Sequence, residues 1–138
     1  MWANLHLLGQ SNIFLALVGF WGEVGLARAM AYQTQLLADA VALLAAAWGT
    51  EQLVPPSQSA GCMALVRIPV DGSAATSKAV QDTLHFEHKV ECPVKTVNGR
   101  LYVRVSAAVY NEIEDYQKLA TAVTAIAAEI DDAAASSL

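Results

Sequence analysis

The dipeptide Asn98-Gly99 lies between two extended runs, Glu91 to Val97 and Arg100 to Ala107. Both residues tolerate the positive φ that a two-residue turn requires, so the pattern predicts a tight β-hairpin. Alternate residues of the second run are apolar and are expected to face the core: Leu101, Val103 and Val105. The residues between them would then face the other way: Tyr102, Arg104 and Ser106. The hairpin therefore places an antiparallel sheet at the centre of the fold.

Two helices are predicted before the sheet. Ser11 can cap a short helix from Asn12 to Glu23, and Gly25 suits the left-handed position that ends it. A longer helix is expected from Leu26 to about Trp48, closed by Gly49. Apolar residues recur along it at three-to-four spacing and should face inward: Leu26, Met30, Leu37, Val41, Leu44 and Trp48.

The remaining elements alternate strand and helix. Cys62 to Val70 is expected to be a buried strand that Pro69 closes, and Asp71-Gly72-Ser73 should turn into a helix that ends near His88. Val80 and Leu84 would face inward on that helix. Asn111 with Glu114 is a capping pattern that opens a final helix. Its core positions recur at helical spacing: Ile113, Leu119, Val123, Ile126 and Ile130.

This order predicts an α/β (α+β) fold in which a small, mostly antiparallel sheet of about three strands carries helices packed on it. We expect an irregular lead-in at residues 1–11, one domain at 12–132 and a frayed tail at 133–138. The helix around Ile13 to Trp21 is apolar on all sides, which is typical of a helix that is buried all round. A single small domain rarely buries such a helix, so we expect a missing partner domain or a homo-oligomer.

Composition agrees with an absent partner and limits the other possibilities. Hydrophobic residues make up 55% of the chain and charged residues only 15%, whereas typical domains carry about 25% charged residues. The net charge of −5 and the scattered basic residues argue against nucleic-acid binding and against an anionic membrane surface. The apolar stretch Ile13 to Gly22 is too short to span a bilayer. Two cysteines predict no disulfide framework, so a cytoplasmic location is expected.

Arg104 is the one charged residue in the middle of the predicted hairpin strand Arg100 to Ala107. A guanidinium group stays charged at any working pH and matches a carboxylate with two parallel hydrogen bonds. Its position alone leaves three possibilities open: it binds a ligand carboxylate, it pairs with a local Asp or Glu, or it faces water.

A longer pattern surrounds Arg104. The run from Arg104 to Asn111, Arg-Val-Ser-Ala-Ala-Val-Tyr-Asn, resembles the end of class V aminotransferase-like, fold-type I pyridoxal-phosphate enzymes. Glu91 to Val94, Gly22 to Arg28 and Met63 to Pro69 look most like the branch of isopenicillin N epimerase-like and cysteine desulfurase-like proteins. The resemblance covers roughly residues 12–130.

The resemblance implies a function for the chain. In this family the arginine at the position of Arg104 binds the α-carboxylate of an amino-acid substrate, and the complete enzymes are dimers. The chain would be the small, substrate-carboxylate-binding domain of an epimerase, lyase or desulfurase-like enzyme. Pyridoxal phosphate is held in the family by a lysine of a larger domain that is absent here, and none of the lysines sits in a cofactor-lysine context: Lys78, Lys89, Lys95 and Lys118. This chain alone is therefore expected to bind no cofactor and to be no complete catalyst.

Two further candidates and one competing function remain. Desulfurases carry a nucleophilic cysteine on this domain, but Cys92 precedes a proline in a strand start and is expected to be a buried small hydrophobe. His85 and His88 have a spacing that metal sites use, yet no third ligand accompanies them, so no metal site is predicted. The alternative function is a non-catalytic orphan domain that self-associates or binds a protein partner.

Overall fold

The computed structural model describes residues 15–58, 61–72 and 74–136. The chain divides into two compact units, Met1–Tyr32 and Gln33–Leu138, and helix α2 (Leu26–Trp48) begins in the first and continues into the second. In the first unit, residues 15–24 are helical and Gly25 ends that helix with a φ of 80°. The predicted helix and its glycine stop are thus present, whereas Ser11 and Asn12 lie outside the described residues.

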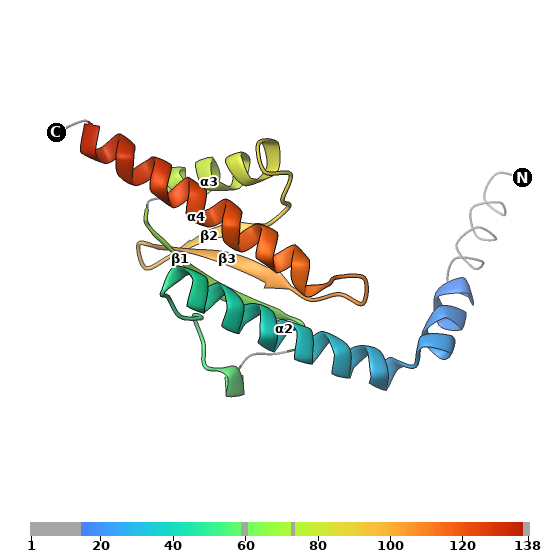
Figure 1. Cartoon of the computed structure of the whole chain (residues 1–138). Coiled ribbons are helices and arrows are strands. Elements are labelled where there is room, and N and C mark those ends of the chain that lie inside the picture. The colour runs from blue at the N-terminus through green and yellow to red at the C-terminus, as the bar shows by residue number, and fades with distance from the viewer. Residues whose placement is uncertain (1–14, 59–60, 73, 137–138) are drawn as a thin grey trace, which may run out of the picture. The chain divides into compact units, whose positions relative to one another are not determined.

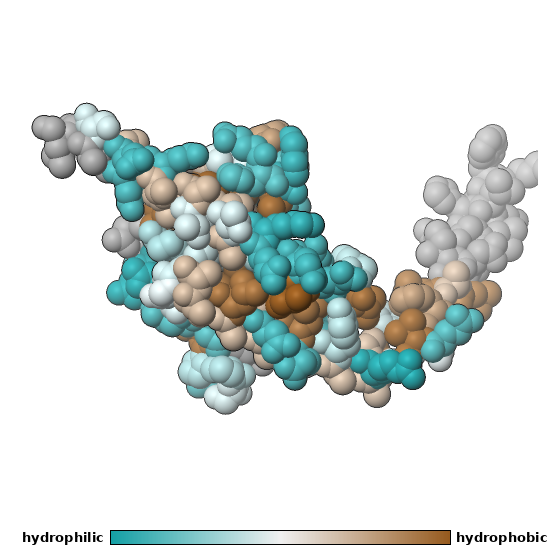
Figure 2. Space-filling view, viewed as in Figure 1, coloured by the Kyte–Doolittle hydropathy of each residue, from teal (hydrophilic) through white to brown (hydrophobic). Residues whose placement is uncertain are grey.

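The first unit exposes large apolar side chains along both of its helical segments, which Figure 2 shows as brown surface. They are Leu15, Leu17, Val18, Phe20, Leu26 and Met30, each between 45% and 65% exposed. The prediction that Leu26 and Met30 face inward is therefore wrong. The core-facing stripe of α2 begins at Leu36, after the boundary between the two units, and periodicity alone does not reveal where a core begins along a helix.

The second unit is built on one three-stranded antiparallel sheet (Figure 1). The strands are β1 (Met63–Asp71), β2 (Val94–Val97) and β3 (Arg100–Ser106), in the order β1-β3-β2. The predicted hairpin is confirmed, because Asn98 and Gly99 join β2 to β3 with φ values of 49° and 73°. Both values lie in the left-handed region that this turn requires. The predicted fold class, helices on a small antiparallel sheet, is also confirmed.

The strand predicted from Cys62 to Val70 is present as β1, Met63–Asp71, and Pro69 lies within it without closing it. Its pairing with β3 shifts between Arg67 and Asp71, and this bulge accommodates a residue that has no N–H to donate. The outer edge of β1 is covered in turn by the segment after α2. There Arg67 donates its N–H to Glu51 and Leu53 donates its N–H to Leu65, at 3.0 and 2.8 Å. This pairing protects the edge from other chains.

Helices α2, α3 (Ala74–Phe86) and α4 (Ile113–Ser136) supply the rest of the core. Val80 and Leu84 of α3 are fully buried, as predicted, and α4 packs through Leu119, Val123 and Ile126. A buried hydrogen bond from Trp48 Nε1 to the carbonyl of Ala120, at 3.2 Å, joins α2 to α4. Helix α4 runs on to Ser136, through four residues of the tail that we expected to fray.

The two faces of the sheet differ. The core cluster that unites the three helices takes its side chains from one face, which we call the packed face: Ala64, Val66, Ile68, Val94, Leu101, Val103 and Val105. The alternate residues point the other way and form what we call the open face: Met63, Leu65, Arg67, Lys95, Val97, Arg100, Tyr102, Arg104 and Ser106. Within the part of the chain that is described, the core cluster includes no side chain of the open face.

Candidate carboxylate-binding site

Arg104 lies on the open face of the central strand β3, opposite Leu65 of β1. Its backbone is held from the other side as well: its N–H donates to the carbonyl of Pro93 at 2.9 Å, and its carbonyl accepts a bond from the Cys92 thiol at 3.4 Å. The predicted alternation holds for Leu101, Val103 and Val105, which are buried, and for Arg104 and Ser106, which are exposed. The strand thus holds the backbone of Arg104 in place, while its side chain remains in solvent.

Tyr102 departs from the simple alternation. It points away from the core cluster, as predicted, yet only 5% of it is exposed. Its direct neighbours across the sheet are Arg67 and Lys95, whose long aliphatic stems can cover an aromatic ring while their charges remain in water. Tyr102 is therefore buried although it lies outside the core cluster that the helices share.

A hollow of about 700 Å³ opens beside Arg104, which we call the Arg104 cavity. Three segments surround it: the loop after α3, the end of β3 with the turn that follows, and the first turns of α4. They contribute residues 89–93, 104–106, 110–111, 115–116 and 118–119. Tyr110 stands at this hollow with 83% of its surface exposed. The cavity is large enough for an amino acid, and Arg104 is the arginine among the residues that line it.

Two acidic residues line the Arg104 cavity, and both are engaged elsewhere. The Asp115 carboxylate accepts the backbone N–H of Glu112 at 3.1 Å and the side-chain amide of Asn111 at 3.2 Å. These two hydrogen bonds, the backbone one first, lower the pKa of Asp115 below its usual 3.8. Glu91 lies 2.5 Å from Nδ1 of His85. Among the described side chains no acid pairs with Arg104, so the local ion pair that the sequence left open is not found.

Asn111 has a structural role that differs from the predicted cap. Its side-chain oxygen accepts the N–H of Ala108 at 3.0 Å and so closes the turn after β3. The Glu112 N–H at the start of α4 is capped by the side chain of Asp115, three residues later, whereas the sequence suggested Asn111 and Glu114 as the capping pair. An acid at the third helical position is a recognised capping signal, and Asp115 occupies that position in α4. The sequence therefore contained this cap one residue after the predicted Glu114.

Cys92 is 6% exposed, and burial is the main cause that raises its pKa to about 12, while the charge of Arg104 acts in the opposite direction. The thiolate is the nucleophilic form of cysteine, and at neutral pH this side chain stays a thiol. Its S–H donates to the carbonyl of Arg104. This environment is that of a buried structural cysteine, in agreement with the sequence-based expectation.

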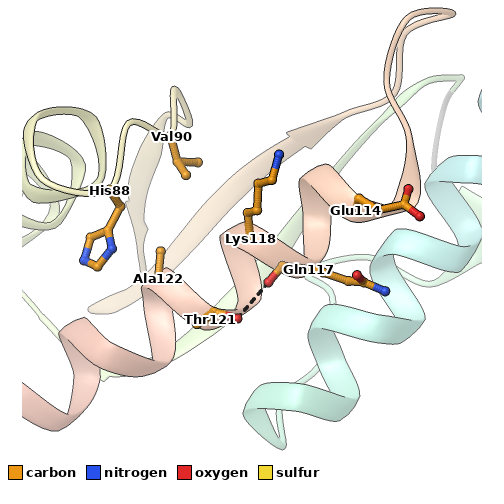
Figure 3. A pocket seen from close by; sticks show the side chains of 7 residues that line it. All are labelled: His88, Val90, Glu114, Gln117, Lys118, Thr121 and Ala122. Atoms are coloured by element: carbon orange, nitrogen blue, oxygen red, sulfur yellow. Dashed lines mark hydrogen bonds between the residues drawn. The ribbon is translucent and has the colours of Figure 1, made fainter.

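A second hollow, of about 500 Å³, is drawn in Figure 3 and shares Lys118 and Val90 with the Arg104 cavity. It contains His88 and Val90, together with Glu114, Gln117 and Thr121 along one side of α4. His85 is bonded to Glu91 and does not line this hollow. Over the described residues no group of three or more His, Cys, Asp or Glu side chains could hold a metal ion.

The described lysines do not resemble a cofactor-binding lysine. Such a lysine needs a desolvated amine, and all four described side chains are exposed: Lys78, Lys89, Lys95 and Lys118. Lys78 pairs with Asp82, and Lys89 donates to the carbonyl of Phe86 at 2.6 Å. None of the helices in the described part of the chain has both the length and the hydropathy needed to cross a bilayer.

Comparison with known proteins places these features in context. No family model matches the chain. An L-cysteine desulfhydrase of Arabidopsis thaliana is 32% identical over 100 residues, a match that covers 59% of this chain and 22% of that protein. Among solved structures, 8-amino-7-oxononanoate synthase of Francisella tularensis superimposes on 84% of the chain with a TM-score of 0.57 and 19% identity. The chain covers 32% of that structure, and the likeness concerns the fold.

Proposed function

We propose that this chain is the small, substrate-carboxylate-binding domain of a pyridoxal-phosphate-dependent enzyme that acts on an amino acid. The observation that carries this proposal is Arg104, an exposed arginine with no acidic partner among the described residues, at the wall of a cavity of about 700 Å³. The similarity to an L-cysteine desulfhydrase and to the fold of a synthase supports it. Because the match spans 22% of the desulfhydrase, the activity is proposed for a larger assembly.

Arg104 is suited to the role for two physical reasons. Its guanidinium group offers two parallel N–H donors that match a carboxylate, and it keeps its charge whatever the pH. The hydrogen bonds that its backbone makes with Pro93 and Cys92 hold Arg104 in the strand, so no backbone segment has to be ordered when a ligand binds. A carboxylate held in this way orients the bonds around the α-carbon of the substrate.

The described residues do not fit as a complete site for pyridoxal phosphate. The cofactor requires an imine-forming lysine and donors for its phosphate, and the described lysines are exposed side chains on the surface. We propose that a larger domain outside this chain supplies those groups. The chain itself would contribute carboxylate recognition, and Cys92, which stays a thiol at neutral pH, would not serve as a sulfur carrier.

The remaining properties of the complete protein are also proposals. The similarity to a desulfhydrase favours a small amino acid such as L-cysteine as substrate, within a branch that resembles the epimerase-like and desulfurase-like class V enzymes. A homodimer would be the complete form. A cytoplasmic location suits the two cysteines, Cys62 and Cys92, which are both free thiols.

A domain exchange tests the role of Arg104. The matching segment of the Arabidopsis desulfhydrase would be replaced by this chain, and kcat/KM would be measured for the parent chimera and for Arg104→Lys. Losing one charge-assisted hydrogen bond, about 1.5–3 kcal/mol, should lower kcat/KM about tenfold to a hundredfold. Arg100→Lys, on the same strand and the same face, is the matched control and should change little. Equal kinetics for the parent and Arg104→Lys would refute the assignment.

If the chimera is inactive, the isolated chain offers a second test. An NMR titration with L-alanine should shift the side-chain N–H signal of Arg104, and L-alanine amide, which lacks the carboxylate, should not. Equal responses to both compounds would argue against carboxylate recognition.

The alternative is a non-catalytic domain that self-associates through the first helix. Leu15, Leu17 and Val18 are all more than half exposed, and such a row of apolar side chains favours an interface. Self-association alone does not separate the two functions, because a homodimer is also proposed for the complete enzyme. The alternative is favoured if Leu17→Glu dissociates an oligomer in sedimentation while Arg104→Lys leaves the kinetics of the chimera unchanged. A visible absorption band on adding pyridoxal phosphate would instead show that the chain binds the cofactor without a second domain.

A further inference from the structure

A bound carboxylate needs more hydrogen-bond donors than Arg104 alone supplies. The two carboxylate oxygens offer about four lone-pair sites, and a guanidinium fork engages two of them. A lone pair that loses water without gaining a donor costs free energy, so buried polar groups are almost always hydrogen-bonded. In the site proposed above, which a larger domain would close, we therefore expect a second donor among the residues that line the Arg104 cavity.

Most side-chain donors at the Arg104 cavity are engaged within the chain. The thiol of Cys92 and the hydroxyl of Tyr116 donate to backbone carbonyls of β3, at 3.4 and 2.8 Å. The ammonium group of Lys89 donates to a backbone carbonyl at 2.6 Å, and the amide of Asn111 donates to a carboxylate at 3.2 Å. Three further described residues carry the side-chain donors that remain at this cavity: Ser106, Tyr110 and Lys118.

Ser106 shares a strand and a face with Arg104. It lies two residues further along β3, both side chains are exposed on the open face, and both line the Arg104 cavity. Side chains two residues apart on one face of a strand are separated by about 7 Å, a distance that an arginine side chain can span. The hydroxyl of Ser106 makes no hydrogen bond to any other described residue. It is therefore available to a ligand that Arg104 holds.

The backbone around Ser106 is held on both sides. Its carbonyl accepts the hydroxyl of Tyr116, a buried side chain of α4. The following residue, Ala107, donates its N–H to the carbonyl of Cys62 at 2.8 Å and accepts the side-chain amide of Gln33 at 3.1 Å. Contacts from α2, from α4 and from the residue before β1 thus fix this strand end. A donor that is already held in place loses little entropy when a ligand binds.

The other two remaining donors are less suited to the same carboxylate. Tyr110 follows in the turn after β3, with 83% of its surface exposed. Lys118 belongs to α4, where its charge interacts with that of Asp115, three residues earlier. Neither residue lies on the strand that carries Arg104, whereas Ser106 does.

We propose that the hydroxyl of Ser106 is a second substrate contact, which donates a hydrogen bond to the carboxylate that Arg104 binds. The inference rests on the proposed function and deepens it, because it assigns two donors of one strand to the same group of the substrate. Arg104 supplies the charge and two parallel N–H donors, and Ser106 supplies a neutral donor at a fixed position.

The full chain tests this contact without the larger domain. L-alanine would be titrated into wild type, Ser106→Ala and Ser106→Thr, and the side-chain N–H signal of Arg104 would be followed by NMR. Loss of one hydrogen bond of ordinary strength should weaken binding about threefold to tenfold in Ser106→Ala. Ser106→Thr keeps the hydroxyl and suits a strand, so it should bind L-alanine as wild type does. Ser57→Ala removes an exposed hydroxyl outside the cavity and, as the matched control, should leave the affinity unchanged.

Stability separates a binding role from a structural one. Ser106→Ala retains the backbone carbonyl that accepts the Tyr116 hydroxyl, so Tm should stay within about 2 °C of wild type. A larger drop in Tm would make the hydroxyl structural and would overturn the inference. A loss of affinity that Ser106→Thr does not restore, or that Ser57→Ala shows equally, would overturn it as well.

The two proposals fail separately in these measurements. If the Arg104 signal of wild type does not respond to L-alanine, both proposals fail. If it responds with the same affinity in wild type and Ser106→Ala, only the second contact fails. In the domain exchange, Ser106→Ala should raise KM about threefold to tenfold with kcat unchanged, a smaller effect than that of Arg104→Lys. A lower kcat at unchanged KM would contradict a contact that holds the bound substrate.

Discussion

The two faces of the sheet obey different physical constraints, although they alternate residue by residue along the same strands. On the packed face Val66, Ile68, Leu101 and Val103 are completely buried. On the open face Arg104 and Ser106 are exposed, and Tyr102, the one buried side chain among those described there, is flanked by Arg67 and Lys95. The packed face determines whether the chain folds. The open face adds no described side chain to the core cluster, although Tyr102 is buried there.

Truncating a packed side chain should have the largest effect. Leu44 of α2 is completely buried in the core cluster, and Leu44→Ala should lower the free energy of unfolding by about 2–5 kcal/mol. Leu65→Ala makes the same chemical change on the open face and should cost less than about 1 kcal/mol, because Leu65 lies outside that cluster. Urea denaturation measures both values. Equal losses would show that the open face carries a core of its own.

Removing the cap of α4 should have an intermediate effect that depends on pH. Asp115→Asn weakens the bond to the Glu112 N–H and should cost about 0.5–1 kcal/mol at neutral pH. Because folding lowers the pKa of Asp115, its stabilising contribution is present above pH 3.8 and is lost as the pH falls through the lower, folded pKa. The stability difference between wild type and variant should therefore shrink below that pH. A difference that persists in acid would mean that the charge is not what stabilises the cap.

Changing Arg104 should have the smallest effect on folding. Arg104→Ala removes an exposed side chain with no ion pair to a described acid, so the free energy of unfolding should change by less than about 0.5 kcal/mol. Thermal denaturation beside Leu44→Ala would measure the contrast directly. A loss of more than about 1 kcal/mol would assign Arg104 a structural role and weaken the comparison between the two faces.

Local patterns predicted most of the second unit. The Asn98-Gly99 turn, α2 from Leu26 to Trp48 and the inward positions Val80 and Leu84 follow from turn chemistry and helical period, which are properties of neighbouring residues. Errors arose where distant parts of the chain decide. Pro69 stays within β1 because a bulge accommodates it, and Leu26 and Met30 are exposed because the core begins later along α2.

The sequence by itself determined the hairpin, the alternation along β3 and the position of Arg104 on the face opposite the core, since strand period and turn chemistry act over a few residues. Only the tertiary structure decided what surrounds that arginine. The loop after α3 and the start of α4 form the Arg104 cavity, burial keeps Cys92 a thiol, and pairing with β1 brings Arg67 beside Tyr102. Each of these depends on contacts between residues far apart in the chain, which no local pattern encodes.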